Sequence, residues 1–137
     1  MNKERDIFRC LVLHARGTMN KVLVISVHPD DETLGCGGTL LKHKANNDEI
    51  YWCVVTRMKE PTFSKEAATK KEKEIETVAK MYSFCRVYSL GLTATKVYEY
   101  PFHTLVLEIS NFVNDIKPNI LSLPCKYDIH SDHRIMF

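Results

Sequence analysis

Residues that can do chemistry are concentrated in two stretches of this chain. The first stretch is His28-Pro29-Asp30-Asp31-Glu32, and the second is Lys126-Tyr127-Asp128-Ile129-His130-Ser131-Asp132-His133. Imidazole and carboxylate groups are the donors of catalytic zinc sites, which use three protein ligands and leave a further position to water. Acids crowded together also repel one another unless a cation offsets their charge. The two stretches therefore predict one divalent metal site, provided that the fold brings them together.

Each stretch follows a short apolar run that is typical of a buried strand. Residues 21–27 form the first run and residues 119–125 the second. Between them the pattern predicts a helix over 33–44, a strand over 49–56, a helix over 65–82, a strand over 86–90 and a helix over 102–116. The alternation of strands and helices predicts an α/β, Rossmann-like, doubly wound parallel sheet with helices on both faces.

The order of the strands decides whether the two stretches meet. In the common doubly wound order 3-2-1-4, strands one and four are neighbours, and the loops after them line one crevice. Pro29 disfavours a helical conformation at His28, so His28 stays extended at the strand end. We expect Asp31 to turn in beside it and His133 to supply the third ligand. These donors suit Zn²⁺, and they also suit Fe²⁺, Co²⁺ or Mn²⁺.

Length and composition set limits on the class of protein. The 137 residues suffice for one domain, and 45% apolar with 26% charged residues is ordinary for a globular protein. Met19 directly precedes the first strand, so we expect residues 1–18 to be an N-terminal extension or a disordered arm. Residues 19–137 then form a single α/β domain. A net charge of +2 gives no case for nucleic-acid binding.

The cysteines and the apolar runs predict a cytoplasmic protein without a membrane span. Five cysteines, with no C-x-x-C pair, are typical of reduced intracellular thiols. No run approaches the ~20 apolar residues of a transmembrane helix. The run from Ile7 to Leu13 is interrupted by Arg9 and is too short for a signal peptide. The oligomeric state stays open, and a homo-oligomer is one of the alternatives.

The two stretches together resemble a known family. The segment from Val27 to Gly38, with His130-Ser131-Asp132-His133 after the fourth strand, is similar to the zinc-dependent N-deacetylases called LmbE-like or GlcNAc-phosphatidylinositol de-N-acetylase (PIG-L) proteins. The resemblance runs from Met19 to the last residue. It implies hydrolysis of an N-acetyl group from a small amino-sugar substrate, such as an N-acetylglucosamine-type sugar or conjugate.

The resemblance also implies a role for each residue of the two motifs. His28, Asp31 and His133 resemble the zinc ligands. Asp30 resembles the general base that takes a proton from the attacking water. His130 resembles the group that stabilises the oxyanion and protonates the leaving amine, with Asp132 orienting His130. Glu32 resembles a supporting acid at the helix start.

Two other functions compete with the deacetylase. Members of the family usually run well beyond the second motif, whereas this chain stops at Phe137, so we expect a fold that is incomplete at its C-terminus. The first alternative is therefore a truncated, inactive fragment that still binds metal. The second is a phospho-receiver-like signalling module, in which Asp30 and Asp31 would hold Mg²⁺. A receiver also needs an aspartate at the end of its third strand, where this chain has Ser89-Leu90-Gly91-Leu92.

Overall fold

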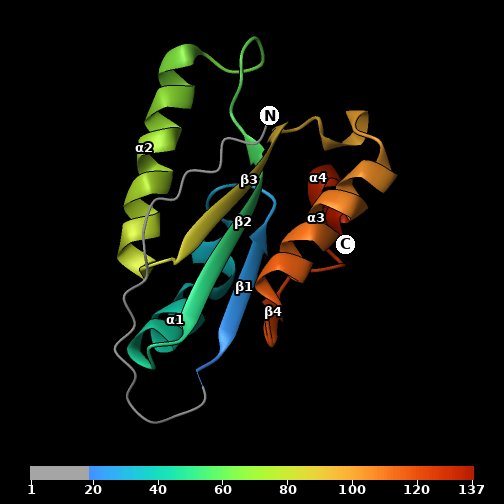
Figure 1. The fold of residues 1–137 in the computed structure, drawn as a ribbon. Coiled ribbons are helices and arrows are strands. Elements are labelled where there is room, and N and C mark those ends of the chain that lie inside the picture. Colours follow the sequence, from blue (N-terminus) through green and yellow to red (C-terminus); the bar gives the residue numbers. More distant parts are fainter. Residues whose placement is uncertain (1–18) are drawn as a thin grey trace.

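A parallel sheet of four strands, in the order β3-β2-β1-β4, forms the centre of the molecule (Figure 1). The computed structural model describes residues 19–137, so the predicted extension over residues 1–18 lies outside the described residues. The strands are β1 (Lys21–Ser26), β2 (Glu49–Arg57), β3 (Arg86–Thr93) and β4 (Ile120–Ser122). The predicted strand order is confirmed, and β1 pairs in parallel with both β2 and β4.

Helices cover both faces of this sheet, as the alternating pattern predicted. Helices α1 (Asp31–Ala45) and α2 (Lys65–Tyr82) lie on one side, and α3 (Phe102–Ile116) lies on the other (Figure 1). A short 3₁₀ helix η1 (Val97–Glu99) and the helix α4 (Ser131–Met136) accompany α3. Within the described residues, no helix combines the length and the apolar character needed to cross a bilayer.

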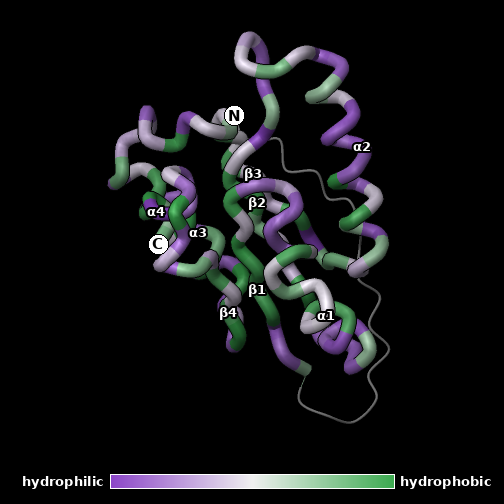
Figure 2. Tube along the Cα trace, turned by 180° about the vertical axis from the view of Figure 1, so that it is seen from behind, coloured by the Kyte–Doolittle hydropathy of each residue, from purple (hydrophilic) through white to green (hydrophobic). Residues whose placement is uncertain are grey.

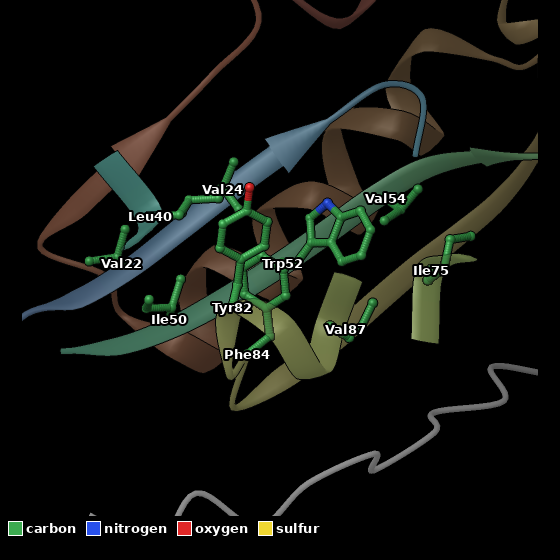
Figure 3. Packing of buried hydrophobic residues seen from close by; sticks show 11 residues of the cluster. Val22, Val24, Leu40, Ile50, Trp52, Val54, Ile75, Tyr82, Phe84 and Val87 are labelled. Atoms are coloured by element: carbon green, nitrogen blue, oxygen red, sulfur yellow. The ribbon is translucent and has the colours of Figure 1, made fainter. Parts of the chain in front are cut away.

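The strand β1 is buried because its side chains belong to two apolar clusters, one on each face of the sheet. Val22 and Val24 pack toward α1 and α2, whereas Leu23 and Ile25 pack toward α3, as the alternation of side chains along a strand requires. Figure 2 shows β1 as a mainly hydrophobic segment and α2 as a largely hydrophilic one. Figure 3 shows Trp52 among the aliphatic side chains of the first cluster. The core therefore fixes β1, the strand that leads into the first motif.

The strands β3 and β4 and the helix α1 differ from the sequence prediction by more than one residue at an end. The strand β3 continues through Gly91, because this glycine adopts a φ of 64° at an irregularity in the β2–β3 register and does not end the strand. The strand β4 has only three residues, all paired with β1, and Pro124 beyond it has no N–H to donate. The helix α1 begins at Asp31, two residues earlier than predicted, and is kinked at Cys36.

Candidate metal centre

The first motif is held in place by the end of β1 and the start of α1. The backbone N–H groups of Asp30 and Asp31 both donate to the carbonyl of His28, at 3.0 and 3.3 Å, so the chain turns sharply there. The carboxylate of Asp31 folds back, and its Oδ2 accepts hydrogen bonds from the N–H groups of Val27 at 3.0 Å and His28 at 2.8 Å. Asp31 is therefore fixed beside His28.

The second motif reaches the same edge of the sheet because β4 lies next to β1. The helix α4 places His133 so that its Nε2 is 3.1 Å from Nδ1 of His28 and 3.3 Å from Oδ2 of Asp31. Ligands of a tetrahedral zinc ion, each 2.0–2.1 Å from the metal, lie about 3.3 Å from one another. The structure thus brings together the three residues that the sequence predicted as ligands, and the pairs His28–His133 and Asp31–His133 lie at the spacing of a shared ion.

The outer nitrogen of each of these two imidazoles contacts a carboxylate. Nε2 of His28 is 3.0 Å from Oδ2 of Asp132, and Nδ1 of His133 is 2.8 Å from Oδ2 of Asp128. A carboxylate accepts hydrogen bonds, so the tautomer that satisfies both Asp132 and Asp128 carries the proton on each outer nitrogen and leaves a lone pair on each inner nitrogen. Oδ2 of Asp31, 3.3 Å from Nε2 of His133, is then a further electron-rich atom that faces this lone pair. Two lone pairs 3.1 Å apart repel one another, and a cation between them removes that repulsion. This donor set fits a divalent metal ion, and the carboxylate partners are those typical of metal-ligating histidines.

Asp132 joins His28 to the segment that follows β3. Its side chain is fully buried, and Oδ2 also accepts a hydrogen bond from the N–H of Thr95 at 2.7 Å. Oδ1 accepts a longer one from the N–H of Val97, at 3.3 Å. We expected this carboxylate to orient His130, and the structure corrects that expectation, since the carboxylate contacts His28. The reason is that the first turn of α4 directs Asp132 inward, toward β1.

His130 and Asp30 are exposed residues of the two motifs. His130 precedes α4, and its Nδ1 accepts a hydrogen bond from the N–H of Asp132 at 3.2 Å. Its ring lies 4.7 Å from that of His28 and 5.2 Å from that of His133, and one nitrogen from each of the three rings lies within 4.8 Å of the others. Asp30 occupies the N-cap position of α1, with its side chain exposed. Both residues are therefore open to solvent. His130 lies against the two imidazoles, and Asp30 directly precedes the candidate ligand Asp31 in the chain.

Asp128 is the site residue that sequence reasoning did not place. In the structure it lies in a turn, where its backbone N–H donates to the carbonyl of Cys125 at 3.1 Å. Oδ2 contacts His133, and Oδ1 accepts a hydrogen bond from the N–H of His130 at 2.9 Å. The N–H of His130 and, next, the imidazole of His133 lower the pKa of the Asp128 carboxyl. The signal available in the sequence was the spacing, because Asp128 lies five residues before His133, the last histidine of the motif.

A pocket of about 420 Å³ adjoins the metal ligands. Asp31, Asp128 and His133 form part of its wall, together with the buried Glu32 and the half-buried Cys36. The remaining lining residues come mainly from β1, the first turn of α1 and the segment after β4: Val24, Ile25, Leu34, Gly35, Ser122, Leu123, Pro124 and Cys125. Burial raises the pKa of Glu32, although the hydroxyl of Thr33 opposes that shift. Burial also raises the pKa of the Cys36 thiol.

The fold and the site together define a class of protein. It is a Rossmann-like α/β protein whose candidate metal ligands meet where the strand order reverses, beyond the carboxyl ends of β1 and β4. The sequence matches the GlcNAc-PI de-N-acetylase (PIG-L) family over residues 23–137, and the chain belongs to this family. No curated protein matches the sequence significantly.

Solved structures show the same fold. The chain resembles the N,N'-diacetylchitobiose deacetylase of Pyrococcus horikoshii, with 26% identity and a TM-score of 0.73 over 87% of this chain and 47% of that one. It also resembles a conserved protein of Thermus thermophilus, with 27% identity and a TM-score of 0.71 over 86% and 52% of the two chains. The 4-carboxy-2-hydroxymuconate hydratase of Pseudomonas putida shares the fold at 13% identity, with a TM-score of 0.73 over 86% and 52%. The chain spans about half the length of each of these structures.

Proposed function

We propose that this protein is a zinc-dependent N-deacetylase that removes the acetyl group from an N-acetylglucosamine-type sugar or conjugate. Membership of the de-N-acetylase family and the likeness to a diacetylchitobiose deacetylase support this proposal. The observation that carries it is the pair of nitrogens, Nδ1 of His28 and Nε2 of His133, that face each other at 3.1 Å while carboxylates hold their outer nitrogens.

His28, Asp31 and His133 are the proposed ligands of the metal ion. His130 is a competing third ligand, because its ring belongs to the same cluster of imidazoles. We favour Asp31, since its Oδ2 is already 3.3 Å from Nε2 of His133 and is held there by two backbone N–H groups. Two imidazoles and one carboxylate are a known donor set of catalytic zinc, and Fe²⁺, Co²⁺ and Mn²⁺ accept the same donors.

The exposed residues beside these ligands supply the proton transfers. A bound divalent ion polarises a carbonyl oxygen and makes water a better nucleophile at neutral pH. Asp30, adjacent in sequence to Asp31 and open to solvent, takes the proton from the attacking water and returns it to the leaving nitrogen. Base and acid are then one carboxyl group, so the proton is conserved through the reaction.

His130 is suited to the oxygen of the reacting amide. Its Nδ1 accepts a hydrogen bond from a backbone N–H, so the neutral ring carries its proton on Nε2. An N–H at that position can donate to the negative charge that develops on the amide oxygen. This geometry supports the first of the two roles that the family resemblance implies for His130, namely stabilisation of the oxyanion.

Metal content and acetate release test the proposal together. We expect the zinc-loaded protein to release acetate from N-acetylglucosamine or its conjugates. Asp30→Asn should keep its zinc and lose about 10²–10⁴-fold in turnover, the usual contribution of a general base. His133→Ala should lose the zinc itself, as measured by inductively coupled plasma mass spectrometry. The control is His103→Ala, which changes an exposed histidine of α3 and should alter neither quantity.

Two results would contradict parts of this proposal. Unchanged turnover in Asp30→Asn rejects Asp30 as the base. Stoichiometric zinc without release of acetate from any N-acetylated sugar favours the second candidate function, a metal-binding module without hydrolytic activity.

A further inference from the structure

The imidazole of His28 is held from outside the two motifs, by the segment that follows β3. Nε2 of His28 is 3.0 Å from Oδ2 of Asp132, and the same oxygen accepts the N–H of Thr95 at 2.7 Å. Oδ1 of Asp132 accepts the N–H of Val97 at 3.3 Å. A backbone N–H can only donate, so each oxygen of this buried carboxyl group is fixed by one backbone group. The position of the His28 ring therefore depends on the backbone of residues 95–97.

This segment begins with a four-residue turn, residues 93–96, which we call the Thr95 turn. The N–H of Lys96 donates to the carbonyl of Thr93 at 3.1 Å and closes the turn. Thr95, the third residue, has a φ of 70°, whereas Ala94 before it does not have a positive φ. This combination is typical of a type II turn, in which glycine or asparagine is usual at the third position. For a β-branched residue the left-handed region is sterically disfavoured, so the surrounding contacts must hold Thr95 there.

The unusual conformation decides where the N–H of Thr95 points. Type I and type II turns differ mainly by a flip of their central peptide group, and the N–H of that group belongs to the third residue. In the type I turn that a threonine would prefer, the N–H of Thr95 would point away from Asp132. The left-handed conformation turns it toward Oδ2, at 2.7 Å. The side chain of Thr95 is exposed, so its contribution to the site is made by the backbone.

The turn is also fixed to the sheet. The N–H of Ala94 donates to the carbonyl of Arg57, the last residue of β2, at 3.1 Å. Ala94 itself is buried. The Thr95 turn therefore joins the carboxyl ends of β2 and β3 to the carboxyl group that contacts His28.

We propose that the Thr95 turn positions the metal centre, because the left-handed conformation of Thr95 directs its N–H to Asp132 and thereby sets the place of the His28 ring. This inference rests on the proposed metal site and names the element that fixes its geometry. Thr95 is a positioning residue, since it acts through Asp132. Loss of a direct partner of a metal-ligating histidine lowers metal affinity about 10–100-fold. Thr95 lies one contact further out, so we expect an effect at the lower end of that range.

Two substitutions test the inference on the full chain. Thr95→Gly keeps the N–H and favours a positive φ, so it should raise the melting temperature of the metal-free protein and keep its zinc affinity within about 2-fold. Thr95→Pro lacks the N–H and fixes φ at about −65°, so it should weaken zinc binding about 10-fold. Competition with a chelator measures zinc affinity. The ¹⁵N chemical shifts of the His28 ring, recorded without metal, report its contact with Asp132.

An amide-to-ester exchange removes the N–H alone and decides the question if Thr95→Pro does not fold. Residues 85–137 can be synthesised and ligated to residues 1–84 at Cys85, which leaves all side chains unchanged. An ester at Thr95 puts an oxygen in place of its N–H, opposite Oδ2 of Asp132. We expect this change to weaken zinc binding about 10-fold and to shift the His28 ring signals.

The matched control is an ester at Ala94, in the same turn. Its N–H donates to the carbonyl of Arg57 and not to Asp132. Both esters remove one hydrogen bond of the Thr95 turn, so both should lower the resistance of the metal-free protein to urea. Only the ester at Thr95 should change the zinc affinity and the His28 ring signals.

The outcomes separate this inference from the proposed function. Wild-type zinc affinity with unchanged His28 ring signals in the Thr95 ester, or equal effects of the two esters on both quantities, overturns the inference. A loss of about 10-fold in zinc affinity in Thr95→Gly, which keeps the N–H, also overturns it. Weaker zinc binding confined to the Thr95 ester supports the inference whether or not acetate is released. If the wild-type protein binds no zinc, the proposed function fails, and a shift of the His28 ring signals confined to the Thr95 ester still supports the positioning role.

Discussion

Replacing Asp132 by asparagine probes the link between the buried carboxylate and the candidate metal ligand His28. In the native arrangement Oδ2 accepts from Nε2 of His28 and from the N–H of Thr95, while Oδ1 accepts from the N–H of Val97. An asparagine keeps the shape, but one oxygen becomes an NH₂ group. Whichever way the amide turns, its NH₂ faces a backbone N–H, so a buried donor loses its acceptor. That loss costs about 1–3 kcal/mol of stability.

The effect on metal binding follows from the tautomer of His28. If the NH₂ group of the asparagine faces His28, Nε2 must become the acceptor, and the ring proton moves to Nδ1, the nitrogen that faces His133. If the amide oxygen faces His28, the tautomer is kept, but the hydrogen bond is no longer assisted by a charge. Changes to such outer partners lower metal affinity about 10–100-fold, which corresponds to roughly 1.4–2.8 kcal/mol. We therefore expect a loss of zinc affinity in that range.

Competition with a zinc chelator measures this affinity, and urea denaturation of the metal-free protein measures the stability separately. Asp128→Asn is the matched control, because Asp128 holds His133 in the same way but has a side chain that is 33% exposed, against 0% for Asp132. Water replaces part of what Asp128 loses, so its effect on zinc affinity should be the smaller of the two. Wild-type affinity in a folded Asp132→Asn protein, or a larger loss in Asp128→Asn, would refute the reasoning.

Two further predictions concern the scaffold. Burial works against the Asp48 carboxylate, but hydrogen bonds from His43 at 2.7 Å and from Asn20 outweigh it and lower its pKa below 3.8. The folded-state pKa is the depressed one, so this stabilisation is complete above pH 3.8 and is lost as the pH falls through the folded-state value. Asp48→Ala should accordingly lower the free energy of unfolding in urea by about 2–4 kcal/mol at pH 7 and by less at pH 3. A constant difference between the two pH values would contradict this account. Gly37→Ala should destabilise the fold by about 1–3 kcal/mol, because its Cβ would lie 2.7 Å from the hydroxyl of Tyr82. Gly38→Ala, with nothing within 4 Å of its Cβ, should be neutral or stabilising by up to ~1 kcal/mol, and equal melting temperatures for the two variants would count against the packing argument.

The strand order could be predicted because hydrophobic pattern and topology rules act on whole elements. Each of the four apolar runs is a strand, and the two charged stretches meet because β1 and β4 are neighbours. Element ends were less predictable, since they depend on single backbone conformations. Gly91 is an example, because a glycine that normally ends a strand here allows β3 to continue.

The partners within the site could not be predicted from the spacing of residues. Spacing places Asp132 between His130 and His133, but the direction of its side chain depends on the turn of α4 and on the N–H groups of Thr95 and Val97. Those two groups come from the segment after β3, which carries no chemical motif of its own. We therefore expected Asp132 to contact His130, whereas its carboxylate contacts His28. The second motif did include Asp132 among the candidate site residues.

A shared fold does not by itself select the reaction, since a hydratase has the same arrangement of strands. The choice must lie in side chains, and we expect residues 30–32, at the start of α1, to contribute to it. Asp30 is exposed, Asp31 turns back to the histidines, and Glu32 is buried. Asp30 is the N-cap and lies outside the helix, and the successive helical residues Asp31 and Glu32 point in directions about 100° apart, so the three neighbouring acids face different surroundings. Under the proposed function, Asp30 can therefore act on water and Asp31 on the metal ion without competing for the same space.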